Sequence, residues 1–272
     1  MKYESGFHNI TNEEYHSAEG LSSSQLKSLA QSAHAFHMKK KYPDLFDAGE
    51  TGGQRLGTLE HMAILEPHRF DSIVRCVDGS RNATKVKEEI ELHEKNGFYV
   101  CKTKEKRRAE VMKYESLRTS KRLSEFVNLP NAQKEISIIA EWDGLQVKCR
   151  PDLFWTNGKQ LIVMDVKTFT DLSDEALMRQ IFKMKYHWQS WWYLKVIELA
   201  TGIKSNKFGH AFIDAKYFQA RVIFLDDAAL EKAEQEIGVL WERYKKGMNT
   251  GEWDAIPDEI TDLSLPHYGF YE

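Results

Sequence analysis

The chain has 272 residues, of which 42% are hydrophobic and 29% charged, a balance typical of a globular protein with a substantial core. Its net charge of -3 excludes recognition of nucleic acid by overall attraction, so any DNA binding must come from local basic patches. The three widely spaced cysteines argue against a disulfide framework, a zinc site or an iron–sulfur cluster. The sequence shows neither a signal peptide nor 18 consecutive apolar residues. Together with the cysteine pattern, this favours a cytoplasmic protein without a membrane segment.

The N-terminal part of the chain is predicted to be helical. Apolar residues at helical spacing predict a first helix within residues 21–41 and a second over residues 55–65, which Pro67 ends. Two charged amphipathic segments, residues 85–95 and 103–123, predict two more helices.

The pattern then changes to that of strands. Residues 135–142 and 145–155 are rich in β-formers and flank Asp143-Gly144, a pair typical of a hairpin turn. Residues 160–167 form a third strand, and their continuous apolar run indicates burial on both faces.

The C-terminal part predicts a further alternation. An aromatic-rich helix covers residues 174–199, and strands follow over 207–214 and 218–225. A helix capped by Asp226-Asp227 then continues to about residue 246.

This order predicts an α/β fold with a central mixed β-sheet flanked by helices. We expect a single domain over residues 1–272. Its parts are a helical N-terminal region over about 12–130, a sheet core over about 133–247, and an irregular tail over 248–272.

Two carboxylates and a lysine fall at the predicted ends of neighbouring strands. Asp152 follows Arg150-Pro151, and Asp165 and Lys167 end the apolar run of the third strand. A carboxylate at the end of a buried strand is costly unless it is paired or binds a metal. The cluster could hold a hard divalent cation beside a fixed ammonium, as in metal-dependent nucleases. The alternative is a structural ion pair of Asp165 and Lys167 with Arg150.

Two helices add polar groups that could belong to the same site. His61 lies one helical turn after Gly57, which permits close approach of another backbone, although a lone histidine is more often a core or surface residue. Gln189 and Tyr193 are four residues apart and share one face of the helix after the third strand. Their alternative role is core packing.

In this order, G-x-x-x-H, P-D, D-x-K and Q-x-x-x-Y resemble the PD-(D/E)XK nuclease superfamily, in particular its RecB-like exonuclease branch. A closer resemblance, from about Tyr15 to Pro266 and weak through residues 73–134, is to the RecE family, the C-terminal nuclease domain of exonuclease VIII. The segments that carry it are Tyr15-His16, Gly20-Leu21-Ser22-Ser23-Ser24-Gln25-Leu26, Leu56-Gly57-Thr58 with His61, Leu65-Glu66-Pro67, Cys149-Arg150-Pro151-Asp152, Met164-Asp165-Val166-Lys167-Thr168, Tyr186-His187-Trp188-Gln189 and Leu263-Ser264-Leu265-Pro266.

The expected metal site contains four residues. Asp152 and Asp165 would hold Mg²⁺ through carboxylate oxygens, which hard cations prefer. The resemblance implies that the carbonyl of Val166 adds a ligand. It also implies that His61 is a further ligand, which would let Mn²⁺ substitute.

Other residues are expected to act on the substrate. Lys167 would orient the attacking water or stabilise developing charge, and Gln189 and Tyr193 would position the scissile phosphate or the water. Glu135 and Glu141 are reserve carboxylates.

The resemblance implies 5′→3′ degradation of linear double-stranded DNA, which leaves 3′ single-stranded tails for recombination by strand annealing. It also implies a toroidal homotetramer, a single-strand annealing partner of the RecT type, and the cytoplasm of a bacterial or phage-infected cell. The absence of a G-x-x-x-x-G-K-[ST] loop predicts that ATP is not used. Alternatives are an endonuclease on the same fold and a non-catalytic DNA-end-binding module. Candidate DNA contacts are Ser22, Ser24, Arg150, Arg179, Lys183 and Lys185.

Overall fold

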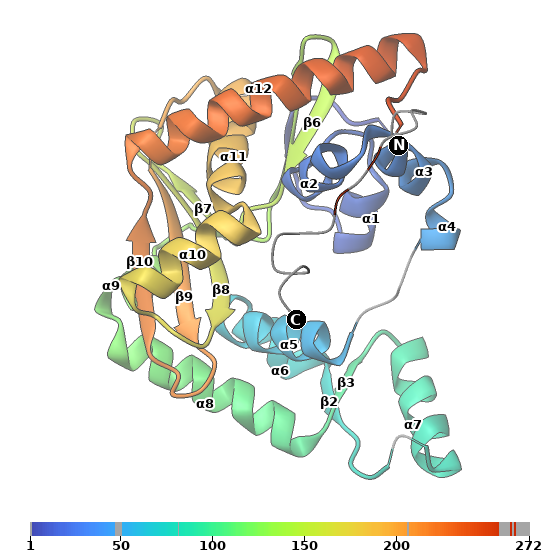
Figure 1. The fold of residues 1–272 in the computed structure, drawn as a ribbon. Coiled ribbons are helices and arrows are strands. Elements are labelled where there is room, and N and C mark those ends of the chain that lie inside the picture. The colour runs from blue at the N-terminus through green and yellow to red at the C-terminus, as the bar shows by residue number, and fades with distance from the viewer. Residues whose placement is uncertain are drawn as a thin grey trace.

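A mixed five-stranded sheet forms the centre of the molecule (Figure 1). The computed structural model describes residues 2–46, 51–80, 82–205, 207–255, 262 and 264. Strands β8 and β9 run parallel, and the other neighbours in this sheet are antiparallel. In sheet order the strands are β10 (Ala220–Phe224), β9 (Phe208–Asp214), β8 (Leu161–Phe169), β7 (Leu153–Thr156) and β4 (Gln133–Lys134).

The chain segments that follow β4 and precede β7 belong to a second sheet. It consists of β1 (Gly6–His8), β5 (Ser137–Trp142) and β6 (Leu145–Cys149). The hairpin between β5 and β6 turns at residues 143–144, as predicted, with φ of 50° and 80° that suit a type I′ turn.

The prediction of two uninterrupted strands on either side of that hairpin is wrong. β4 is separated from β5 at residues 135–136, and β6 is separated from β7 at residues 150–152. Glu135 adopts a left-handed conformation with φ of 55°, and its N–H donates to the carbonyl of Asp152 over 3.3 Å. Pro151 has no N–H to offer a ladder. The strand pair therefore bends here from one sheet into the other, as at a β-bulge.

Helices cover both faces of the main sheet. On one face, α11 (Tyr186–Thr201), α12 (Asp227–Thr250) and α2 (Ser23–Gln31) pack around the fully buried Trp192. On the other, α5 (Gly52–Leu65), α8 (Thr103–Thr119) and α9 (Lys121–Val127) pack against β8 and β9. Figure 1 shows α12 along the top and α8 along the bottom. None of the described helices is both long and apolar enough to cross a membrane.

Three long helices predicted from spacing are each two helices. They break at Ser32, Ser120 and Lys185, which separate α2 from α3 (Ala33–Lys41), α8 from α9, and α10 (Asp174–Met184) from α11. The hydroxyl of Ser32 accepts from the N–H of Ala35 at 3.0 Å, and that of Ser120 accepts from the N–H of Leu123 at 3.2 Å. Serine side chains offer the backbone an alternative partner, so each starts a new helix.

Several short elements have no periodic signal in the sequence. They are α1 (Asn12–Ser17), α4 (Pro43–Phe46), α6 (Pro67–Ile73), and the parallel pair β2 (Val74–Cys76) and β3 (Tyr99–Cys101) around α7 (Thr84–Lys95). Pro67 follows the end of α5 as predicted and also begins α6. α12 ends at Thr250, inside the predicted irregular tail. Apart from Ser264, the C-terminal resemblance segment 263–266 lies outside the described residues.

Candidate metal centre

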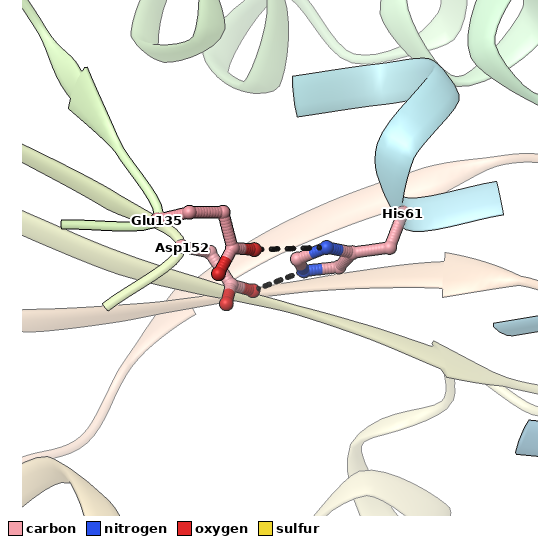
Figure 2. A group of neighbouring side chains, drawn as sticks. All are labelled: His61, Glu135 and Asp152. Carbon is pink, nitrogen blue, oxygen red and sulfur yellow. Dashed lines mark hydrogen bonds and ion pairs between the residues drawn. The ribbon is translucent and has the colours of Figure 1, made fainter. Parts of the chain in front are cut away.

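Three potential metal ligands converge where the two sheets meet (Figure 2). The imidazole of His61 lies between two carboxylates, with Nε2 at 2.7 Å from Asp152 Oδ2 and Nδ1 at 3.2 Å from Glu135 Oε1. One potential ligand atom from each residue lies within 4.8 Å of the others. They come from α5, from the junction of β4 and β5, and from the residue before β7. The fold thus brings distant parts of the chain to one point.

Two arginines, Arg150 and Arg108, hold this arrangement in place. Arg150 donates from Nε to Glu135 Oε2 at 3.1 Å and from Nη1 to the hydroxyl of Ser137 at 2.6 Å, so the glutamate faces His61. Next to His61 on α5, the buried carboxylate of Glu60 accepts from Arg108 Nε at 2.7 Å. Arg108 also donates to a backbone carbonyl beyond β9, which ties α5 to the main sheet.

Asp165 lies beside this cluster, but not at a strand end as predicted. β8 continues to Phe169 because it pairs with β9 along that whole stretch. Asp165 is 3% exposed, its Oδ1 accepts from the amide of Gln189, and the Lys167 ammonium lies against its Oδ2. The next residue, Val166, donates its N–H to Asp152 Oδ2, so both aspartates belong to one site.

Burial and neighbouring charges shift the pKa values of the residues at this site. Burial, reinforced by the charge of Asp165, raises the pKa of Asp152 to about 6. Burial alone would lower the pKa of His61, but the carboxylates of Asp152 and Glu135 outweigh it and hold that pKa well above its usual value. The imidazolium therefore donates to both carboxylates, at a position that a metal cation could occupy.

The donor set fits a divalent cation. Carboxylate oxygens suit magnesium, and an imidazole nitrogen among them suits manganese as well. The buried Asp165 Oδ2, which lies against the Lys167 ammonium, adds a third carboxylate beside those of Glu135 and Asp152. Carboxylates gathered this closely repel one another unless cations lie among them, and a divalent metal ion would be one such cation.

The other predicted catalytic residue, Tyr193, is buried one turn after Gln189, and its phenol contacts that amide. Burial raises its pKa well above the usual value, so the phenol stays protonated. The reserve carboxylate Glu141 is exposed opposite Gln146 near the hairpin turn and lies outside the ligand cluster.

The predicted DNA-contact residues have varied surroundings. Arg150 is engaged with Glu135, and the side chain of Arg179 pairs with Glu175 at 2.9 Å on an exposed helix face. Lys185 lies 3.8 Å from Glu236, and Lys183 is exposed on α10. No described contact links Arg179, Lys183 or Lys185 to the cluster of His61, Glu135 and Asp152.

The serines act within their own helix cap. Ser22 and Ser24 share a hydrogen bond of 3.1 Å between their hydroxyls at the start of α2. The N–H of Ser22 donates to the side chain of Gln25 at 2.9 Å, which is a helix-capping arrangement.

Glu135 is the residue whose importance sequence reasoning underrated. Counting outward from the hairpin turn could have found it. Trp142 faces Leu145 and Ile138 faces Cys149. The same count places Glu135 opposite Asp152, and cross-strand partners lie on one face of a sheet.

Comparison with known proteins supports the fold. A protein-family model described as "PDDEXK-like domain of unknown function" (DUF3799) matches residues 22–261. The crystal structure of a protein from Eubacterium rectale described as a "putative exonuclease" shares 16% sequence identity, with a TM-score of 0.64 over 97% of this chain and 98% of that one. A further structure, SSO0001, reaches a TM-score of only 0.32 at 14% identity, over 85% and 79% of the two chains. No curated protein matches the sequence. The predicted PD-(D/E)XK fold, a mixed sheet flanked by helices, is confirmed.

Proposed function

This chain belongs to the PDDEXK-like family DUF3799 within the PD-(D/E)XK nuclease superfamily, and we propose that it hydrolyses phosphodiester bonds of DNA with a divalent cation. The observation that carries the proposal is the convergence of His61, Glu135 and Asp152 beside the Asp165–Lys167 pair of β8. Nuclease chemistry needs clustered hard ligands next to a positive charge, and this corner of the sheet provides both.

The residues that would hold the cation are His61, Glu135, Asp152 and Asp165, with the Val166 carbonyl as the ligand that the resemblance adds. A bound divalent cation neutralises charge on the phosphate and makes water a better nucleophile at neutral pH. We propose Mg²⁺ as the natural ion, with Mn²⁺ able to substitute because an imidazole is among the ligands.

Lys167 supplies a permanent positive charge. Burial would lower its pKa, but the charges of Asp165 and Asp152 more than compensate and hold it above its usual value. The ammonium is therefore protonated at neutral pH. It can orient water through its N–H groups or stabilise negative charge on the phosphate.

Gln189 and Tyr193 hold the site in shape. The Gln189 amide donates to Asp165 Oδ1, which leaves Oδ2 directed toward Lys167. Tyr193 backs this amide from the core side of α11. We propose that the pair fixes the carboxylate and that Gln189 also contacts the phosphate or the water.

The finer activity we propose is 5′→3′ exonuclease action on linear double-stranded DNA, leaving 3′ tails for recombination by strand annealing. The RecE-like motifs support it, and so does the fold shared with a structure described as a putative exonuclease. A ring-shaped homotetramer and an annealing partner of the RecT type remain predictions from the resemblance.

The test is digestion of linear duplex labelled at either the 5′ or the 3′ ends, beside a covalently closed circular duplex. We expect early release of the 5′ label in Mg²⁺ or Mn²⁺, an intact circle, and no digestion in a chelator or by Asp165→Asn. Cutting of the circle would instead show an endonuclease. Failure to cut any DNA with either cation would overturn the proposed function.

A further inference from the structure

A second lysine reaches the site from the N-terminal helix α2. The ammonium of Lys27 lies 5.7 Å from the centroid of the Tyr186 ring, and that of Lys167 lies 5.1 Å from the same centroid. Tyr186 is the first residue of α11, one turn before Gln189, and its ring is almost fully buried. One aromatic ring therefore holds two ammonium groups beside the metal centre.

The two lysines differ in how their charges are balanced. Lys167 lies against Asp165, whereas Lys27 forms no ion pair within the described parts of the chain. Lys27 is exposed as a residue, but partial burial of its ammonium lowers its pKa first, the charge of Lys167 lowers it further, and the charge of Asp165 partly offsets both. Because Lys167 already pairs with Asp165, a further anion beside Lys27 would stabilise its ammonium more fully.

The position of Lys27 is fixed by the packing of α2. Leu26 and Leu29 are fully buried in the main core. Just before the helix, Leu21 exchanges backbone hydrogen bonds with β6, donating to Gln146 at 3.0 Å and accepting from Lys148 at 2.8 Å. The ammonium of Lys27 is thus carried by a rigidly packed helix. Little conformational entropy is lost when it contacts a ligand, which favours such a contact.

We propose that Lys27 contacts a non-bridging oxygen of a backbone phosphate of the nucleic-acid substrate, beside the phosphate at the metal centre. The inference rests on the proposed function and adds a substrate contact to it. Lys27 and Lys167 then neutralise neighbouring parts of one strand, and Tyr186 keeps the two ammonium groups apart.

The test compares Lys27→Gln and Lys27→Arg with a matched control, Lys121→Gln. Lys121 is an exposed lysine at the start of α9, on the opposite face of the sheet. Single-turnover cleavage gives a half-saturating DNA concentration and a maximal rate for each variant. We expect Lys27→Gln to raise that concentration roughly tenfold and to reduce its salt dependence by about one ion, with recovery in Lys27→Arg.

Neutral methylphosphonate linkages, placed one at a time along the strand, locate the contact. One position should weaken binding by wild type about tenfold and cause no further loss in Lys27→Gln, while all other positions affect both proteins equally. Thermal unfolding of Lys27→Gln should match wild type, since the side chain is exposed.

The outcomes separate this inference from the proposed function. If wild type and Lys121→Gln cut DNA and Lys27→Gln is equal to them, the lysine contact is wrong and the nuclease assignment stands. Equal losses at every methylphosphonate position would also overturn the contact. A wild type that neither binds nor cuts DNA would overturn both.

Discussion

Replacing Glu135 with glutamine tests which of the two reserve carboxylates, Glu135 or Glu141, belongs to the metal site. The substitution removes one of three negative charges around the centre, those of Glu135, Asp152 and Asp165. It keeps an amide oxygen that can still accept from Arg150, whose Nε now donates to the carboxylate at 3.1 Å. The change is therefore mainly electrostatic.

The expected loss follows from the spacing of the ligands. Two unit charges about 4 Å apart interact by roughly 4 kcal/mol at an effective dielectric constant near 20. Allowing for solvent and for the remaining amide dipole, we expect a loss of about 2–3 kcal/mol in cation binding, or roughly a hundredfold in affinity. Folding should weaken by only about 1 kcal/mol, because the hydrogen bond to Arg150 can persist.

Isothermal titration with Mn²⁺ measures the affinity, and urea unfolding measures the stability. Glu141→Gln is the matched control, since Glu141 is exposed on β5 outside the cluster. We expect its affinity and activity to equal those of wild type. Unchanged affinity in Glu135→Gln, or an equal loss in both variants, would refute the reasoning.

Three further outcomes follow. Because Asp152 and Glu135 raise the pKa of His61 well above its usual value, its proton must leave before the imidazole binds a cation, so Mn²⁺ affinity should keep rising as the pH increases above neutral; a flat profile would contradict this. Gln189→Leu removes the donor to an Asp165 oxygen and should lower cleavage about 10–100-fold with little change in the melting temperature. Lys148→Met removes a buried ammonium that donates to three backbone carbonyls in and just after α1. It should lower the free energy of unfolding in urea by about 2–4 kcal/mol, a loss below 1 kcal/mol being the contrary result.

Much of the fold follows from the sequence because its signals are local. The turn at 143–144 and the buried run of β8 have clear periodic or turn signatures, and both are present as predicted. The breaks at Ser32 and Ser120 do not alter the apolar spacing, so spacing predicts one helix where capping makes two. The three-residue strands β2 and β3 are too short to show any period.

The candidate site was predictable in its residue types and less so in its geometry. His61, Asp152 and Asp165 do lie together, as motif order and element type indicated. The length of β8 beyond Asp165 depends on pairing with β9, a partner some forty residues away in the chain. Lys27 joins the site only because α2 packs against α11, and no local pattern records such a contact.

The most direct measurement is anomalous X-ray diffraction from crystals soaked in Mn²⁺. We predict a peak bonded to His61, Glu135 and Asp152, within roughly 2.0–2.3 Å of their ligand atoms, with Asp165 at or beside it. The peak should vanish in Glu135→Gln at the same concentration. Crystals that hold no ion there, with the imidazole still bridging the two carboxylates, would contradict the metal centre on which the account depends.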